Sequence, residues 1–92
     1  MITDVELIRL GEHEHTETAA WELSGWAGNE RLSVGTLADG RAYRCQVMPS
    51  HELTEVFDSL ELAEQDAAEV RAGVGGYGSE WTEVQPSGPG SE

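Results

Sequence analysis

Residues 32–47, LSVGTLADGRAYRCQV, decide the fold, because two runs of alternating side chains flank the dipeptide Asp39-Gly40. Alternation with a period of two is typical of β-strands, and Asp-Gly is a frequent two-residue hairpin turn. Counting outward from this turn, Ala38 lies opposite Arg41, Thr36 opposite Tyr43, Val34 opposite Cys45 and Leu32 opposite Val47. The pairing therefore predicts a hairpin with one largely apolar face.

A second hairpin precedes the first one along the chain. With Gly28-Asn29 as its turn, Ala27 lies opposite Glu30, and the count brings Leu23 opposite Val34 and Trp21 opposite Thr36, on the same apolar face. The other face should meet water and carries Glu22, Ser24, Trp26, Arg31, Ser33, Arg44 and Gln46. Residues 18–48 are thus predicted to form an antiparallel meander.

A helix is predicted to follow, from Ser50 to Arg71, with Ser50 as its N-cap and Gly73 as its stop. At about 100° per residue, one arc of this helix is apolar and should cover the sheet. The arc consists of Leu53, Val56, Phe57, Leu60, Ala63, Ala67 and Val70, while Leu62 lies exposed. On the opposite side we expect a water-facing set of carboxylates, called here the acidic row: Glu55, Asp58, Glu61, Asp66 and Glu69.

The remaining segments are less regular. Residues 4–10 fit either a fourth strand or a short helix, and we favour the strand because it widens the sheet under the helix. Residues 11–18 read as a polar loop, residues 73–78 as a flexible connection and residues 80–84 as a short edge strand. The prediction is a single α+β domain over residues 1–84, a three- or four-stranded meander with one long helix on one face, and a flexible, disordered tail over residues 85–92.

Charge is the most unusual property of the composition. The 92 residues include 18 Asp and Glu against five Arg and no Lys, which gives a formal net charge of -13. Phosphate-bearing partners gain affinity from cationic side chains, so direct binding to nucleic acid or to an anionic membrane is opposed, and basic protein surfaces are the expected partners. No apolar run reaches the length of a membrane span, and the N-terminus lacks the pattern of a secretion signal, so we expect a cytoplasmic protein.

Candidate chemistry is sparse. His13 and His15, with Glu17 or His51, contain residue types that bind divalent metals, but a solvated polar loop explains the same residues. Cys45 lies on the predicted core face, which indicates a buried structural thiol rather than a nucleophile. We therefore expect neither enzymatic activity nor a cofactor.

Three tryptophans differ in their predicted surroundings. Trp21 falls on the core face of the meander. Trp26, beside a turn on the outer face, and Trp81, near the C-terminus, are candidate anchors for a partner, because exposed aromatic side chains often contribute much of the binding energy. Packing against the rest of the chain is the alternative for both.

The small size, the acidity and the run from Glu52 to Glu69 resemble the small acidic inhibitors of phages and mobile elements, including anti-CRISPR and anti-restriction proteins that mimic nucleic acid. The resemblance is one of class and includes no diagnostic motif. It implies stoichiometric inhibition of a nucleic-acid-binding complex through the acidic row. Two alternatives stay open. One is acidity that serves solubility or salt adaptation. The other is a general adaptor or antitoxin-like domain that uses Trp26 and Arg44 or a strand edge, with self-pairing into a homodimer as one form of it.

Overall fold

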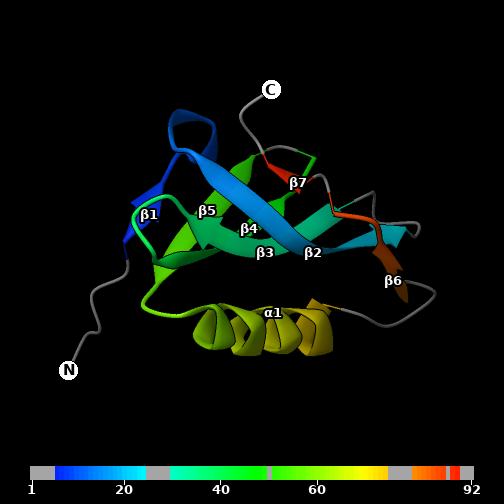
Figure 1. Ribbon diagram of the computed structural model, residues 1–92. Helices are drawn as coiled ribbons and strands as arrows, with labels where there is room; N and C mark the ends of the chain where they lie inside the picture. Colours follow the sequence, from blue (N-terminus) through cyan, green and yellow to red (C-terminus); the bar gives the residue numbers. More distant parts are fainter. Residues whose placement is uncertain (1–5, 25–29, 50, 75–79, 87, 90–92) are drawn as a thin grey trace.

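The computed structural model describes residues 6–24, 30–49, 51–74, 80–86 and 88–89. Figure 1 shows one sheet with a helix lying across one of its faces. In chain order the elements are β1 (Leu7–Ile8), the 3-10 turn η1 (Leu10–Glu12), β2 (His15–Ser24), β3 (Glu30–Leu37), β4 (Ala42–Val47), β5 (Glu52–Phe57), α1 (Leu60–Val74), β6 (Glu80–Val84) and β7 (Gly88–Pro89).

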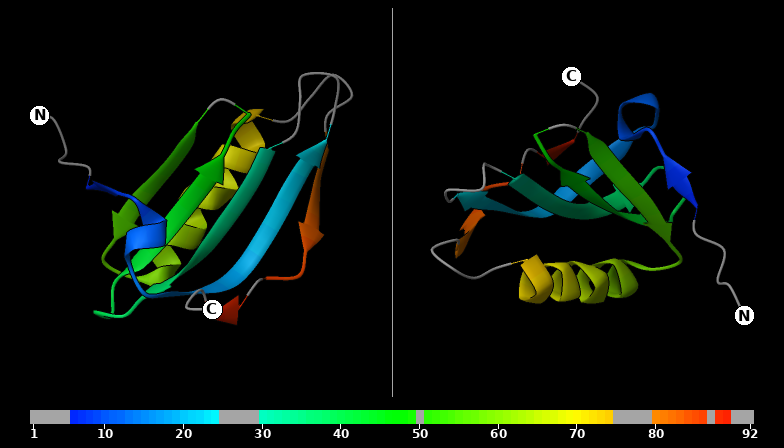
Figure 2. Two further views of the ribbon diagram at one scale, coloured as in Figure 1. Left: turned by 90° about the horizontal axis from the view of Figure 1, so that it is seen from above. Right: turned by 180° about the vertical axis from the view of Figure 1, so that it is seen from behind.

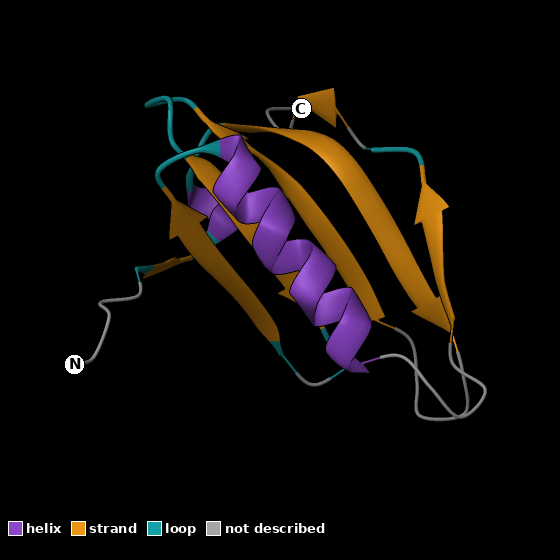
Figure 3. Cartoon of the chain, turned by 90° about the horizontal axis from the view of Figure 1, so that it is seen from below, coloured by secondary structure: helices purple, strands orange, loops and turns teal. Residues whose placement is uncertain are grey.

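The strands are paired antiparallel throughout, in the order β1-β5-β4-β3-β2-β6, and β7 pairs with β2 off this path. The α+β class and the meander with a covering helix are confirmed, but the sheet has more strands than the three or four expected. The helix α1 packs on one face of the sheet against β3 and β4 and runs roughly along these strands (Figure 3).

The register of the β3–β4 hairpin differs from the prediction by one residue: Val34 lies opposite Arg44, and Ser33 opposite Cys45. The turn has three residues instead of two, since the Leu37 amide donates to the Arg41 carbonyl at 2.7 Å and the Gly40 amide donates to the Leu37 carbonyl at 3.0 Å. Gly40 takes a φ of 95°, which this turn requires. A one-residue slip exchanges the faces of β4, so Arg44 points toward α1 and Cys45 points away from it.

The β2–β3 pairing is also shifted, but by an even number of residues: Trp21 lies opposite Leu32 instead of Thr36. An even shift keeps each side chain on its predicted face, and Trp21 packs on the core beneath α1 as expected. The predicted turn at Gly28-Asn29 lies outside the described residues. Strand β2 begins at His15, so the polar loop predicted over residues 11–18 is shorter than expected.

The single long helix predicted over residues 50–71 is wrong in its first half. Residues 52–57 form β5, which pairs with β4, and α1 begins only at Leu60. Ser59 caps the helix, because its hydroxyl accepts the Leu62 amide at 3.3 Å. The predicted cap, Ser50, lies outside the described residues. Within α1 the apolar arc is confirmed, and Leu62 is exposed as expected.

Two apolar clusters lie on opposite faces of the sheet. Beneath α1, the side chains of Leu32, Val34 and Ala42 pack with Ala63 and Ala67 of the helix. On the other face, which we call the outer face, Leu37, Tyr43 and Cys45 pack with Leu10 under the cover of β1 and η1. Figure 2 shows β1 and η1 on the side of the sheet opposite α1, at the end where β2 begins.

The terminal segments contribute more to the sheet than expected. Residues 4–10 supply a strand, as favoured, but only Leu7–Ile8 form it, paired with β5. The edge strand predicted over residues 80–84 is confirmed as β6. Two residues of the predicted tail, Gly88–Pro89, pair with Thr16 and Glu17 of β2. No helix in the described part of the chain is long and apolar enough to cross a bilayer.

Candidate functional site: the acidic surface of the helix

The acidic row does not lie on one helix. Glu55 belongs to β5, Asp58 lies in the connection before α1, and Glu61, Asp66 and Glu69 belong to α1. The cause is the strand at residues 52–57, whose alternating side chains also satisfy a helical spacing in part. The five carboxylates therefore do not form the continuous water-facing row that the sequence predicted.

Arg44 neutralises two members of the row. Its Nη2 donates to Glu55 Oε1 at 2.8 Å, and its Nε donates to Asp66 Oδ2 at 2.8 Å. The Arg44 side chain is only 5% exposed, because the three-residue turn places it under α1 and not on the outer face as expected. Charges removed from water are tolerated when they are paired in this way. The contact with Asp66 thus ties the helix to the sheet, and the contact with Glu55 joins β4 to β5.

The other members of the row face solvent. Asp58, Glu61 and Glu69 are exposed, and so is Glu64, which was not among the predicted residues of the acidic row. We call these four carboxylates the helix acids. None of them forms an ion pair with an arginine of the described residues. From Glu61 to Glu69 they extend over about 12 Å at 1.5 Å per residue.

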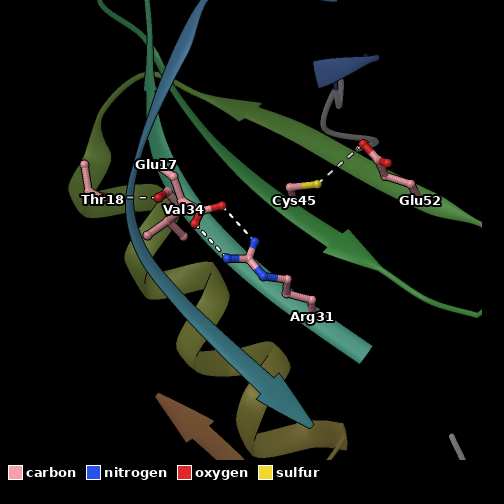
Figure 4. Close-up of polar contacts among 6 residues, drawn as sticks. All are labelled: Glu17, Thr18, Arg31, Val34, Cys45 and Glu52. Atoms are coloured by element: carbon pink, nitrogen blue, oxygen red, sulfur yellow. Dashed lines mark hydrogen bonds and ion pairs between the residues drawn. The ribbon is translucent and has the colours of Figure 1, made fainter. Parts of the chain in front are cut away.

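Most of the arginines form ion pairs with carboxylates of the same chain. Arg31 binds Glu17 with two hydrogen bonds of 2.8 Å (Figure 4), and this contact raises the pKa of Arg31. Arg41 binds Glu6 at 2.7 Å and Asp39 at 2.9 Å, which lowers the pKa of Asp39. These contacts balance the charges of Arg31 and Arg41 with nearby carboxylates and leave the other exposed carboxylates without a cation from these two side chains.

Arg71, near the end of α1, lies with its guanidinium carbon 3.9 Å from the centre of the Trp21 ring. This is a cation–π contact, and it stabilises the packing of the helix on β2. Arg9 is exposed. Of the five arginines, three therefore neutralise carboxylates of the same chain and a fourth stacks on a tryptophan, which leaves the surface strongly anionic.

The two candidate aromatic anchors have different outcomes. Trp81 lies on β6 opposite Leu23 and packs against the core cluster beneath α1, so its ring is used for internal packing at least in part. Its indole nitrogen is buried without a hydrogen-bond partner among the described residues. Trp26 lies outside the described residues.

The candidate metal ligands do not converge. Within the described ranges, no group of three or more His, Cys, Asp or Glu side chains is placed to hold a metal ion. His15 Nδ1 lies 2.7 Å from the His13 carbonyl oxygen, and its ring meets the Tyr43 ring edge-on at 5.5 Å. This histidine is thus engaged in local packing on the outer face.

Cys45 is buried as predicted, but on the outer face rather than beneath the helix. Its thiol donates to Glu52 Oε2 at 3.6 Å (Figure 4), and burial raises the pKa of the thiol. A nucleophilic cysteine needs a lowered pKa and an exposed sulfur. Cys45 has neither property, which agrees with a structural role.

A cleft of about 620 Å³ opens at the end of the sheet where β2 and β4 finish. Its walls include Glu22, Arg31, Val47, Met48 and Val84. No local sequence pattern indicates this cleft, because it depends on the pairing of β6 with β2. No protein-family model, curated protein or solved structure matches the chain, so its function has to be inferred from these surfaces alone.

Proposed function

We propose that this chain is a non-catalytic acidic binding protein that attaches to a basic surface of another protein through the helix acids. The observation that carries the proposal is the pairing of the arginines within the chain. Arg31, Arg41 and Arg44 pair with carboxylates of the same chain, while Asp58, Glu61, Glu64 and Glu69 remain exposed. The protein therefore carries a largely uncompensated negative charge on the solvent-facing side of α1 and at Asp58 just before it.

Such a surface acts before contact is made. At physiological ionic strength the field of exposed charges extends over a Debye length of about 8 Å and accelerates encounters with an oppositely charged partner. Mutual repulsion between carboxylates one turn apart costs a few tenths of a kcal/mol per pair. Binding to a cationic surface would offset this repulsion. It therefore explains the position of the helix acids more specifically than solubility does.

The partner class we propose is a nucleic-acid-binding complex, such as a CRISPR or restriction effector, because such complexes have dense cationic grooves. The protein would occupy such a groove in place of nucleic acid. Arg44 limits this mimicry, because it neutralises Glu55 and Asp66. The helix acids are then the members left to contact the groove. Direct binding to DNA or RNA is opposed by the same negative field.

A general protein-interaction or adaptor domain is the second candidate, and a specific observation supports it. Strand β6 is the last strand in the sheet order of the described residues, so its outer edge is open to another strand. A homodimer formed at this edge would have to overcome the repulsion between two chains of charge -13.

The test is capture of partners from a lysate at about 50 mM and about 500 mM salt, with identification by mass spectrometry. The proposed function predicts basic nucleic-acid-binding proteins that are retained at low salt and released at high salt. Retention of a partner that is insensitive to salt would favour the adaptor. Capture of nothing, or of metabolic enzymes only, would contradict both candidates.

A further inference from the structure

The sheet-end cleft lies on the outer face, opposite α1. The strand registers place Thr82, Glu22, Arg31 and Val47 side by side in one row across β6, β2, β3 and β4. In the described part of the chain, β1 and η1 cover only the other end of this face, over Tyr43 and Cys45 (Figure 2). The row is consequently open, and the cleft of about 620 Å³ forms above it.

The walls of the cleft combine apolar surface with negative charge. Val47 is 39% exposed, although it is a large aliphatic residue in a strand, and Met48, Pro49 and Val84 extend the apolar surface. Glu22 is exposed at the rim. Exposed apolar surface of this kind, with charged groups around it, is typical of sites that bind other proteins.

Arg31 is the one cation among the described residues of the walls, and its charge is compensated. Arg31 directs both terminal nitrogens to Glu17 at 2.8 Å, and Glu17 is 9% exposed. The guanidinium is thus held along the sheet by a bidentate pair, and its charge is balanced there. Glu22 lies opposite Arg31 in the β2–β3 register but forms no ion pair with it, and Glu30 accepts a hydrogen bond from Gln46 Nε2 at 3.1 Å. The cleft as a whole is therefore apolar with a negative rim.

We propose that this cleft binds a short segment of a partner protein in which one aliphatic side chain is flanked by Arg or Lys. The aliphatic group would pack on Val47 and Val84, and the flanking cations would face Glu22. A second copy of this chain fits poorly, because it would bring further negative charge to a negative rim. The inference goes beyond the proposed function, since the cleft and the helix acids lie on opposite faces and each can fail alone.

The test uses two capped peptides, Arg-Arg-Leu-Arg-Arg and Arg-Arg-Gly-Arg-Arg, titrated into the isotope-labelled protein and followed by NMR. We expect the leucine peptide to shift the methyl signals of Val47 and Val84, and the glycine peptide to bind there roughly tenfold more weakly because it buries no aliphatic group. A third peptide, Ser-Ser-Leu-Ser-Ser, should also bind more weakly, because it lacks the cations.

Two variants locate the site. Val47→Thr keeps the shape of the side chain and makes it polar, and Glu22→Gln removes one rim charge; both should weaken the leucine peptide several-fold. Leu62→Ala and Glu61→Gln are matched controls on the exposed side of α1 and should leave this titration unchanged. An unaltered backbone spectrum shows that each variant is folded.

Three results would overturn the cleft as a binding site for such a segment. The first is the absence of methyl shifts with the leucine peptide. The second is equal binding of the leucine and glycine peptides with shifts confined to α1, which would leave the proposed function standing. The third is equal binding of the serine-flanked peptide, which would show that the rim charge plays no part.

Discussion

Arg44 of β4 donates to Asp66 of α1 at 2.8 Å from beneath the helix, where the sequence predicted an arginine facing water on the other side of the sheet. This contact affects both the stability of the fold and the proposed binding surface. It ties α1 to the sheet, and it neutralises a carboxylate that the sequence assigned to partner binding. The exposed part of the acidic row is accordingly smaller than the sequence predicted: Asp58, Glu61 and Glu69 remain exposed, beside Glu64.

Replacing Arg44 by methionine should destabilise the fold. The change leaves Glu55 and Asp66 near one another, partly buried and without their cation, at a cost of about 2–3 kcal/mol after allowance for their partial exposure. The measurement is the free energy of unfolding in urea. Arg41→Met is the control, because it makes the same charge change at an exposed pair, which contributes much less to stability. Equal losses for the two variants would show that the pairs of Arg44 do not stabilise the fold.

Gly35→Ala should also destabilise the protein. A Cβ on Gly35 would collide with the Thr16 carbonyl oxygen and would lie 2.7 Å from the Tyr43 hydroxyl. Overpacking of this kind costs about 1–3 kcal/mol. Gly73→Ala in α1 meets no atom within 4 Å and should be neutral or stabilising. Thermal unfolding of both variants checks the expectation, and a neutral Gly35→Ala would contradict the close approach of the Thr16 carbonyl and of Tyr43 to Gly35 in β3.

Alkaline pH should weaken the fold in two stages. Burial raises the pKa of Cys45 and of Tyr43 in the folded state, so each group holds its proton more tightly there than in the unfolded chain. Stability from these groups is complete below the unfolded pKa values, about 8.5 and about 10, and is lost as the pH rises above them. Urea midpoints from pH 7 to pH 11 measure the loss.

Tyr43→Phe tests whether ionisation of Tyr43 causes the second stage of the alkaline loss of stability. The Tyr43 hydroxyl is buried and has no hydrogen-bond partner among the described residues, so its removal should cost little at neutral pH. The variant should lose less stability than the original protein above pH 10. Coincident profiles for the two proteins would assign the alkaline loss to other groups.

Cys45 should react slowly with iodoacetamide. Its side chain is 4% exposed and its thiol is protonated at neutral pH, so the reaction should be roughly 100-fold slower in the folded protein than in urea. Mass spectrometry over time follows the modification. Rapid, stoichiometric labelling of the native protein would contradict the burial of Cys45 under β1 and η1.

The sequence predicted the class of the fold and the main features of one apolar face, because Leu32, Val34, Ala63 and Ala67 follow clear periods of two and 3.6. It failed at positions where two periods compete. Residues 52–57 satisfy a strand and a helix alike, and only the edge of β4 decides between them. The Asp39-Gly40 turn fits a two-residue or a three-residue loop, and this choice alone moves Arg44 from water to the helix.

The candidate site was predictable in part for the same reason. The exposed acids Glu61 and Glu69 follow from the helical period of α1, whose apolar arc fixes which side faces solvent. Glu55 and Asp66 required knowledge of the β4 register, because only the position of Arg44 removes them from the surface. The sheet-end cleft joins Glu22, Val47 and Val84 from three strands, and no local pattern indicates that β6 pairs with β2.

The central claim is that the helix acids, and not the net charge alone, attract the partner. Its most direct test compares two triple variants of equal charge in the low-salt capture. The first variant combines Asp58→Lys, Glu61→Lys and Glu69→Lys. The second combines Glu12→Lys, Glu14→Lys and Glu83→Lys. All six positions are exposed, so each triple changes the same amount of surface charge. The account predicts that only the first triple loses the basic partner, and equal retention by the two triples would contradict it.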